Sequence, residues 1–117
     1  MKHYVSAKIH GVRVTDKSVD YNGSVSICSD LMRHAGIEQF EKVQIVNLEN
    51  GNRWETYVIK SNDSRAFTLN GGGAFLGDVG DKCVVICYSM RKRFKPFDII
   101  FCDENNFVSQ VMKYENS

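Results

Sequence analysis

The sequence predicts a mainly β protein, a small closed β-barrel with one or two short helices. Short stretches in which apolar and polar residues alternate recur along the chain, and clusters of turn residues separate them. Only one weak helical segment interrupts them, and such a run of short strands is typical of a closed barrel. The length of 117 residues fits one domain, residues 1–117, that buries a core of its own.

The first predicted strand covers Val5 to Thr15, where apolar residues alternate with polar ones at the period of a half-buried strand. Lys8 and His10 lie two residues apart and therefore share the polar face. Such a pair usually forms an exposed polar surface, and a functional role is the alternative. The polar segment 16–20 then leads into a turn.

That turn, Tyr21-Asn22-Gly23-Ser24, is the most informative stretch of the chain. Asn-Gly is a common turn dipeptide, so one interpretation is a simple turn before a strand at Ser24 to Cys28. The other interpretation is chemical. Gly23 has no side chain that would block attack on its carbonyl, so the Ser24 hydroxyl could convert this peptide bond into an ester.

A short helix is predicted directly after this strand. Ser29 or Asp30 is a suitable N-cap, and Gly36 is suited to end the helix. Apolar residues at helical spacing lie between these two ends. We therefore expect a short helix through Leu31, Met32 and Ala35.

A β-hairpin is predicted around Asn50-Gly51, the strongest short turn signal in the chain. Its strands cover Lys42 to Leu48 and Arg53 to Ile59, which are rich in Val, Ile and aromatic residues. Arg53 and Tyr57 lie on one face of the second strand, because side chains alternate along a strand. A packing pair with a solvated arginine is the ordinary interpretation, and a binding pair is the alternative.

The glycine run at 71–73 follows a predicted strand at Ala66 to Leu69. Its backbone N–H groups could bind a carboxylate as readily as a phosphate, and no Lys-Ser/Thr pair follows as in a P-loop. The most apolar strand, Cys83 to Tyr88, should be central. Two further strands, Asp98 to Cys102 and Phe107 to Val111, flank a polar turn.

The charge and cysteine content exclude several classes of partner. Lys and Arg number 15 and Asp and Glu 14, so the net charge of +1 gives no field that attracts nucleic acid or an anionic membrane. The longest apolar stretch is too short to span a bilayer, and we expect a cytoplasmic protein. The four cysteines show no zinc-ligand spacing, so we expect buried thiols and no metal.

Six motifs follow one another in a characteristic order and spacing: Lys8-Ile9-His10, Val14-Thr15, Tyr21-Asn22-Gly23-Ser24, Asn50 to Ile59, Leu69 to Ala74 and Val79-Gly80-Asp81. This series closely resembles the pyruvoyl-dependent aspartate 1-decarboxylases, small bacterial enzymes that cleave themselves at a Gly-Ser bond. The resemblance runs from about Val5 to Tyr88 and weakens after Met90.

The resemblance implies a six-stranded double-psi β-barrel assembled as a homotetramer, with the active site between neighbouring subunits. It also implies self-cleavage into residues 1–23 and 24–117, in which Ser24 becomes a covalent pyruvoyl group. This group replaces pyridoxal phosphate as the electron sink that decarboxylation of an amino acid needs. The residues implied to assist cleavage at Gly23 are Tyr21, His10, Thr56 and Asn70.

For turnover, the resemblance implies that L-aspartate forms a Schiff base with the pyruvoyl ketone and yields β-alanine and carbon dioxide, for pantothenate and coenzyme A biosynthesis. We expect Arg53 to hold the carboxylate that is kept, because gripping the departing one would stabilise the ground state. Lys8 is expected to add positive charge and Tyr57 to protonate the α-carbon. The backbone groups expected to contact the substrate are those of Gly71, Gly72, Gly73 and Ala74.

Several positions depart from the family's pattern. Gly11 stands where arginine is usual, and Gly72 and Gly73 replace alanines. The basic run Arg91 to Lys95 is most simply a solvated loop, and a partner-binding role is the alternative. Two rival functions therefore stay open: the same chemistry on another acidic amino acid or in a specialised pathway, and an unprocessed barrel that acts as a binding module. Cleavage could be spontaneous or could need a maturation factor.

Overall fold

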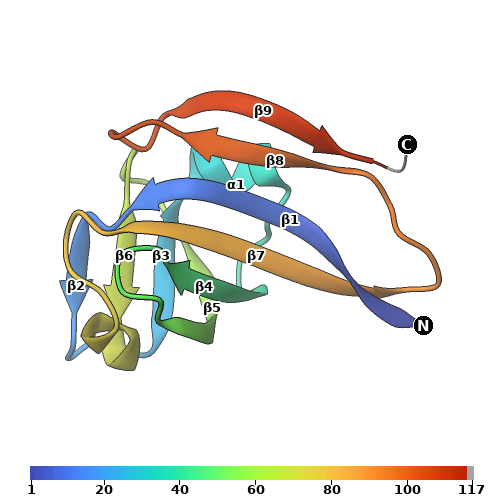
Figure 1. Ribbon diagram of the computed structural model, residues 1–117. Helices are drawn as coiled ribbons and strands as arrows, with labels where there is room; N and C mark the ends of the chain where they lie inside the picture. The colour runs from blue at the N-terminus through green and yellow to red at the C-terminus, as the bar shows by residue number, and fades with distance from the viewer. Residues whose placement is uncertain (116–117) are drawn as a thin grey trace.

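The computed structural model describes residues 1–115 and confirms a mainly β chain (Figure 1). It contains nine strands, one α-helix and one short 3₁₀ helix within this range. In chain order they are β1 (Lys2–Arg13), β2 (Asp16–Ser18), β3 (Ser24–Cys28), α1 (Ser29–Ala35), β4 (Lys42–Asn47), β5 (Arg53–Ser61), β6 (Phe67–Asn70), η1 (Gly71–Phe75), β7 (Lys82–Arg91), β8 (Phe97–Cys102) and β9 (Val108–Tyr114).

All nine strands belong to one strongly curved sheet in the order β2-β6-β3-β5-β4-β7-β1-β8-β9. The long strands β1 and β7 pair antiparallel from Lys2 opposite Arg91 to Arg13 opposite Lys82. They run across the whole molecule in Figure 1, and the N-terminus lies at the right-hand end of this pair in the view. The other edge of β1 pairs in parallel with β8. The apolar strand around Cys83 to Tyr88 is thus an inner strand, as predicted.

Apolar and polar residues alternate along the strands, and the apolar ones form the expected core. On β1, Ala7 and Ile9 are buried whereas Lys8 and His10 between and beyond them are half-buried on the other face. Residues of α1 complete the core, and this helix contacts both β1 and β8. The largest fully buried side chains are Phe67, Ile9, Ile27, Leu31, Ile45, Leu69, Ile100, Val12, Val14, Val25, Val43 and Val58.

The described residues do not show the predicted closed barrel of six strands, which stays a prediction. The sheet has two ends, β2 and β9. Strand β1 is paired with β7 along one edge and with β8 along part of the other, and β2, which follows β1 after two residues, pairs with β6. A side chain links the two end regions: the buried Asn106, in the β8–β9 turn, accepts from Arg13 N and donates to the carbonyls of Arg13 and Arg65.

The helix and hairpin predictions are confirmed in outline and corrected at their ends. Helix α1 ends at Gly36, whose φ of 72° suits a glycine. Its N-cap is Cys28, without a side-chain cap, rather than Ser29 or Asp30. The chain enters the helix directly from β3, so the first possible cap position is already the last strand residue. The β4–β5 connection covers residues 48–52, longer than the two residues Asn50-Gly51 that marked it.

The four cysteines, Cys28, Cys83, Cys87 and Cys102, are free thiols, and all but Cys102 are buried. Burial raises the pKa of Cys83 and of Cys102 to about 12, so these groups stay protonated and unreactive at neutral pH. In the part of the chain that the structure describes, no helix has the length and apolar character needed to cross a membrane.

Candidate functional site

Ser24 is the first residue of β3, and its hydroxyl is fixed by one side chain. The antiparallel pairing of β3 with β6 places Ser24 opposite Asn70. Asn70 Nδ2 donates to Ser24 Oγ at 2.9 Å and to Ser26 Oγ at 3.0 Å. Ser24 is 3% and Asn70 4% exposed. Because a buried hydrogen bond of this kind restricts the side-chain rotamer, Ser24 Oγ is held in one position beside the Gly23–Ser24 bond.

Gly71 lies directly against the residue that precedes Ser24. A Cβ at Gly71 would come within 2.8 Å of Gly23 Cα, 2.9 Å of Gly23 N and 3.0 Å of the Tyr21 carbonyl oxygen. Its φ of +62° also favours glycine. Gly71 is therefore needed for the close approach of two backbone segments, and the start of η1 supports the turn from residue 21 to residue 24.

Strand β5 places Tyr57 on the other side of Ser24. In the parallel pairing of β3 with β5, Val25 lies opposite Val58, so the preceding residues Ser24 and Tyr57 lie side by side on one face. Counting one residue further back along both strands brings Thr56 level with Gly23. Tyr57 is 38% exposed, so its ring faces outward. The structure thus brings Ser24, Asn70, Gly71 and Tyr57 together.

Arg53 begins β5 and shares the outer face of this strand with Glu55 and Tyr57, as predicted. Arg53 is exposed, and four residues of strand separate its Cα from that of Tyr57 by roughly 13 Å. Glu55 lies between them and forms an ion pair with Lys42 of β4 at 2.5 Å. This pairing offsets a negative charge that would otherwise repel an anion bound between Arg53 and Tyr57.

The rest of the glycine run surrounds this group without forming a P-loop-like helix start. Gly72 is exposed, and a Cβ there would meet no atom within 4 Å. Gly73 packs on Trp54, whose Nε1 would lie 3.1 Å from a Cβ. Ala74 is 2% exposed. The sequence did not predict that residues 71–75 form the 3₁₀ helix η1. Only part of the backbone of this glycine run therefore faces outward.

Lys8 and His10 are not brought to Ser24 within one chain. In the sheet order, β5, β4 and β7 lie between β3 and β1. Lys8 Nζ lies over the ring of Tyr114 at 6.0 Å, and the His10 ring is 5.4 Å from that of Phe101. Burial, with the charges of Lys8 and Lys82, lowers the pKa of His10, so the imidazole is neutral at pH 7. Tyr21 is exposed, and its backbone carbonyl is the part that lies near Gly71.

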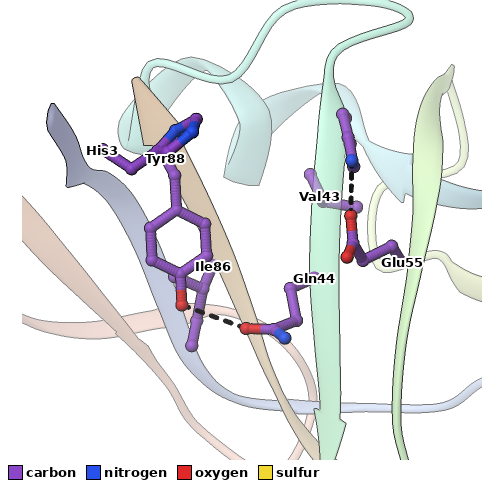
Figure 2. A pocket seen from close by; sticks show the side chains of 7 residues that line it. His3, Val43, Gln44, Glu55, Ile86 and Tyr88 are labelled. Atoms are coloured by element: carbon purple, nitrogen blue, oxygen red, sulfur yellow. Dashed lines mark hydrogen bonds and ion pairs between the residues drawn. The ribbon is translucent and has the colours of Figure 1, made fainter. Parts of the chain in front are cut away.

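A groove of about 410 Å³ lies on the outer face of β5, β4, β7 and β1. Figure 2 shows Tyr88 of β7 donating to Gln44 Oε1 of β4 at 3.0 Å, with Glu55 on the neighbouring strand. None of the site residues predicted from the sequence lines this groove. It therefore adjoins the outer face that carries Arg53 and Tyr57 rather than covering Ser24.

Sequence reasoning missed Ser26, which shares the Asn70 amide with Ser24. The signal was available, because residues two apart on a strand share a face. It also missed that Asn47, Asn50 and Asn52 act as side-chain donors, since Asn in a turn is usually read as a turn former. Among residues 1–115, no three His, Cys, Asp or Glu side chains gather as a metal ion would require.

Comparison with known proteins gives consistent matches. A model of the aspartate decarboxylase family matches residues 1–109. The chain is 41% identical over 116 residues to an aspartate 1-decarboxylase from Campylobacter jejuni strain 81-176, covering 95% of this chain and 91% of the relative. It is 40% identical to that of Clostridium novyi over 97% of this chain and 96% of the relative, and 42% identical to that of Caldicellulosiruptor bescii over 97% and 93%.

Proposed function

The chain belongs to the aspartate decarboxylase family, and we propose that it cleaves itself at Gly23–Ser24 and then converts L-aspartate to β-alanine and carbon dioxide. The observation that carries this proposal is the buried Ser24 hydroxyl, held by Asn70 next to a glycine that Gly71 packs against. A turn with no chemical role would not need a buried, singly oriented hydroxyl at this position.

The proposed self-cleavage starts with addition of Ser24 Oγ to the Gly23 carbonyl carbon. The C–N bond breaks, and the hydroxyl proton ends on the freed Ser24 amine. The Ser24 Cα then loses a proton, its Cβ–O bond breaks, and Gly23 leaves as a carboxylate. The remaining dehydroalanine takes up one water and releases ammonia. Residues 1–23 and 24–117 are the resulting chains, and residue 24 carries a pyruvoyl group.

The chain's own residues divide the work around that bond. Asn70 positions the nucleophilic oxygen, and its further role as a donor to the Gly23 carbonyl oxygen stays a prediction. Thr56, level with Gly23, is the second predicted donor there. Tyr21 and His10 stay predicted helpers; a neutral His10 can accept a proton.

The same surroundings suit a small acidic substrate. When present, the pyruvoyl ketone condenses with an amine and draws electrons from the α-carbon. Arg53 would bind the carboxylate that is kept, and Tyr57, beside residue 24, would supply the proton to the α-carbon. The backbone of residues 71–74 is the predicted further contact. Neither a metal nor pyridoxal phosphate has a place in this scheme.

We propose that a neighbouring copy supplies Lys8, because this residue contacts the β8–β9 hairpin and lies on a strand far from β3 in the sheet order. A homotetramer with sites between subunits meets this need. The double-psi arrangement, the cytoplasmic location, the place in pantothenate biosynthesis and the maturation factor stay predictions that the family resemblance suggests.

The test is the intact mass of freshly purified protein under denaturing conditions, beside a Ser24→Ala control. We expect two fragments that meet at Gly23–Ser24, a larger one with a blocked N-terminus, and a control that stays whole. Carbon dioxide release from aspartate and from glutamate then separates the two acidic substrates. A chain that stays whole on prolonged warming would contradict the proposal and favour the binding-module alternative.

A further inference from the structure

Three asparagine side chains from the end of β4 and the β4–β5 turn converge on one backbone carbonyl. The Nδ2 atoms of Asn47, Asn50 and Asn52 lie 3.2, 3.1 and 3.2 Å from the Leu76 oxygen. Leu76 is the residue that ends η1, and its own N–H donates to the Gly73 carbonyl. A carbonyl has two lone pairs, so three donors on it are more than a loop connection requires.

The surroundings are built to hold this arrangement, which we call the asparagine clamp (Asn47, Asn50, Asn52 and the Leu76 carbonyl). Asn47 is fully buried, and its second amide hydrogen goes to Asp81 Oδ2 at 2.9 Å. A Cβ at Gly77 would lie 2.9 Å from Asn47 Nδ2, so only glycine leaves room for this amide. Asn50 Oδ1 accepts from Asn52 N at 2.9 Å, which couples two members of the clamp.

The clamp joins two segments that both border the proposed site. On one side, η1 begins with Gly71, which packs against Gly23. On the other side, β5 begins directly after Asn52 with Arg53, and the next residue, Trp54, packs on Gly73. Because η1 is only five residues long, a shift at its C-terminal end is transmitted to Gly71 with little loss.

We propose that Asn50 and Asn52 are positioning residues for self-cleavage: by holding the Leu76 carbonyl they press Gly71 against Gly23 and keep the Gly23–Ser24 bond in its reactive geometry. This inference rests on the proposed function. It assigns these residues no contact with the reacting atoms. Their effect on cleavage is therefore on its rate, through the position of the turn at residues 21–24.

The test substitutions are Asn50→Asp and Asn52→Asp, with Asn62→Asp as the matched control in an exposed loop. Each replacement keeps the side-chain size, and at residue 50 it keeps the oxygen that accepts from Asn52 N. Each removes the amide donor and turns an anion toward the Leu76 oxygen. Cleavage is followed by intact mass from freshly translated chain, and thermal unfolding is measured on the same variants in a Ser24→Ala background.

We expect both clamp variants to cleave at least about tenfold more slowly than the parent chain and the Asn62→Asp control, while unfolding within a few degrees of them. Parent-like cleavage of both variants would overturn the inference and leave the proposed function intact. So would a defect that follows the loss of thermal stability. A parent chain that stays whole overturns the proposed function and this inference with it.

Discussion

Gly71→Ala is the most direct perturbation of the contact between η1 and the cleavage turn. A Cβ at this position would lie 2.8 Å from Gly23 Cα, and ordinary contact begins at 3.4 Å, so the two backbones must separate by about 0.6 Å. The φ of +62° adds a left-handed penalty of roughly 1 kcal/mol. Overpacking of this kind costs a further 1–3 kcal/mol or so.

The expected result is slower self-cleavage with a folded chain. A displacement of about 1 Å can cost on the order of a hundredfold in rate, so a shift of this size should slow cleavage by about tenfold or more. The assay is intact mass against time for freshly translated chain, with the unfolding temperature measured in a Ser24→Ala background.

Gly72→Ala is the matched control for this experiment. A Cβ there meets no atom within 4 Å, and Gly72 is not among the glycines with positive φ. Alanine should therefore fit, and its cleavage rate should equal that of the parent chain. If Gly71→Ala and Gly72→Ala cleave at the same rate, the contact with Gly23 does not control the reaction, and the reasoning is refuted.

Three other outcomes are expected. Tyr57→Phe should still cleave but lose about a hundredfold in kcat, because the phenol proton is lost; unchanged carbon dioxide release would exclude this role. Gly11→Ala should lower the free energy of unfolding by about 1 kcal/mol, because φ is +89°; an unshifted urea midpoint would contradict this expectation. The lowered pKa of His10 means that the unfolded chain takes up a proton first as pH falls through about 6.5, so stability should fall there. His10→Gln should lack this part of the pH dependence in thermal melts, and parallel curves would contradict it.

The strands could be predicted because their alternation matches burial on the two faces of one sheet. Ala7 and Ile9 are 2% and 0% exposed, as the period of two requires. The end of α1 followed from Gly36, since a left-handed residue favours glycine. These features depend on local chemistry, which a single sequence contains.

Features that depend on distant pairing could not be predicted in the same way. The alternation of β1 does not show that β8 pairs with its second edge, or that β2 pairs with β6. The Asn70 bond to Ser24 depends on the register of β3 and β6, which are 46 residues apart at this contact. The asparagine clamp needs Leu76 folded back onto a turn more than twenty residues earlier. The presence of Asn in a turn does not indicate such a long-range contact.

The place of β1 between β7 and β8 bears on the lifetime of the processed protein. Cleavage after residue 23 would turn an inner strand into part of a separate peptide that only noncovalent pairing retains. Unfolding would then become a dissociation, so the melting temperature would rise with protein concentration. Loss of that peptide would leave the edges of β7 and β8 unpaired, a template for aggregation. The uncut chain can refold in a unimolecular reaction. The lifetime of the cut protein would instead depend on how slowly the peptide of residues 1–23 dissociates.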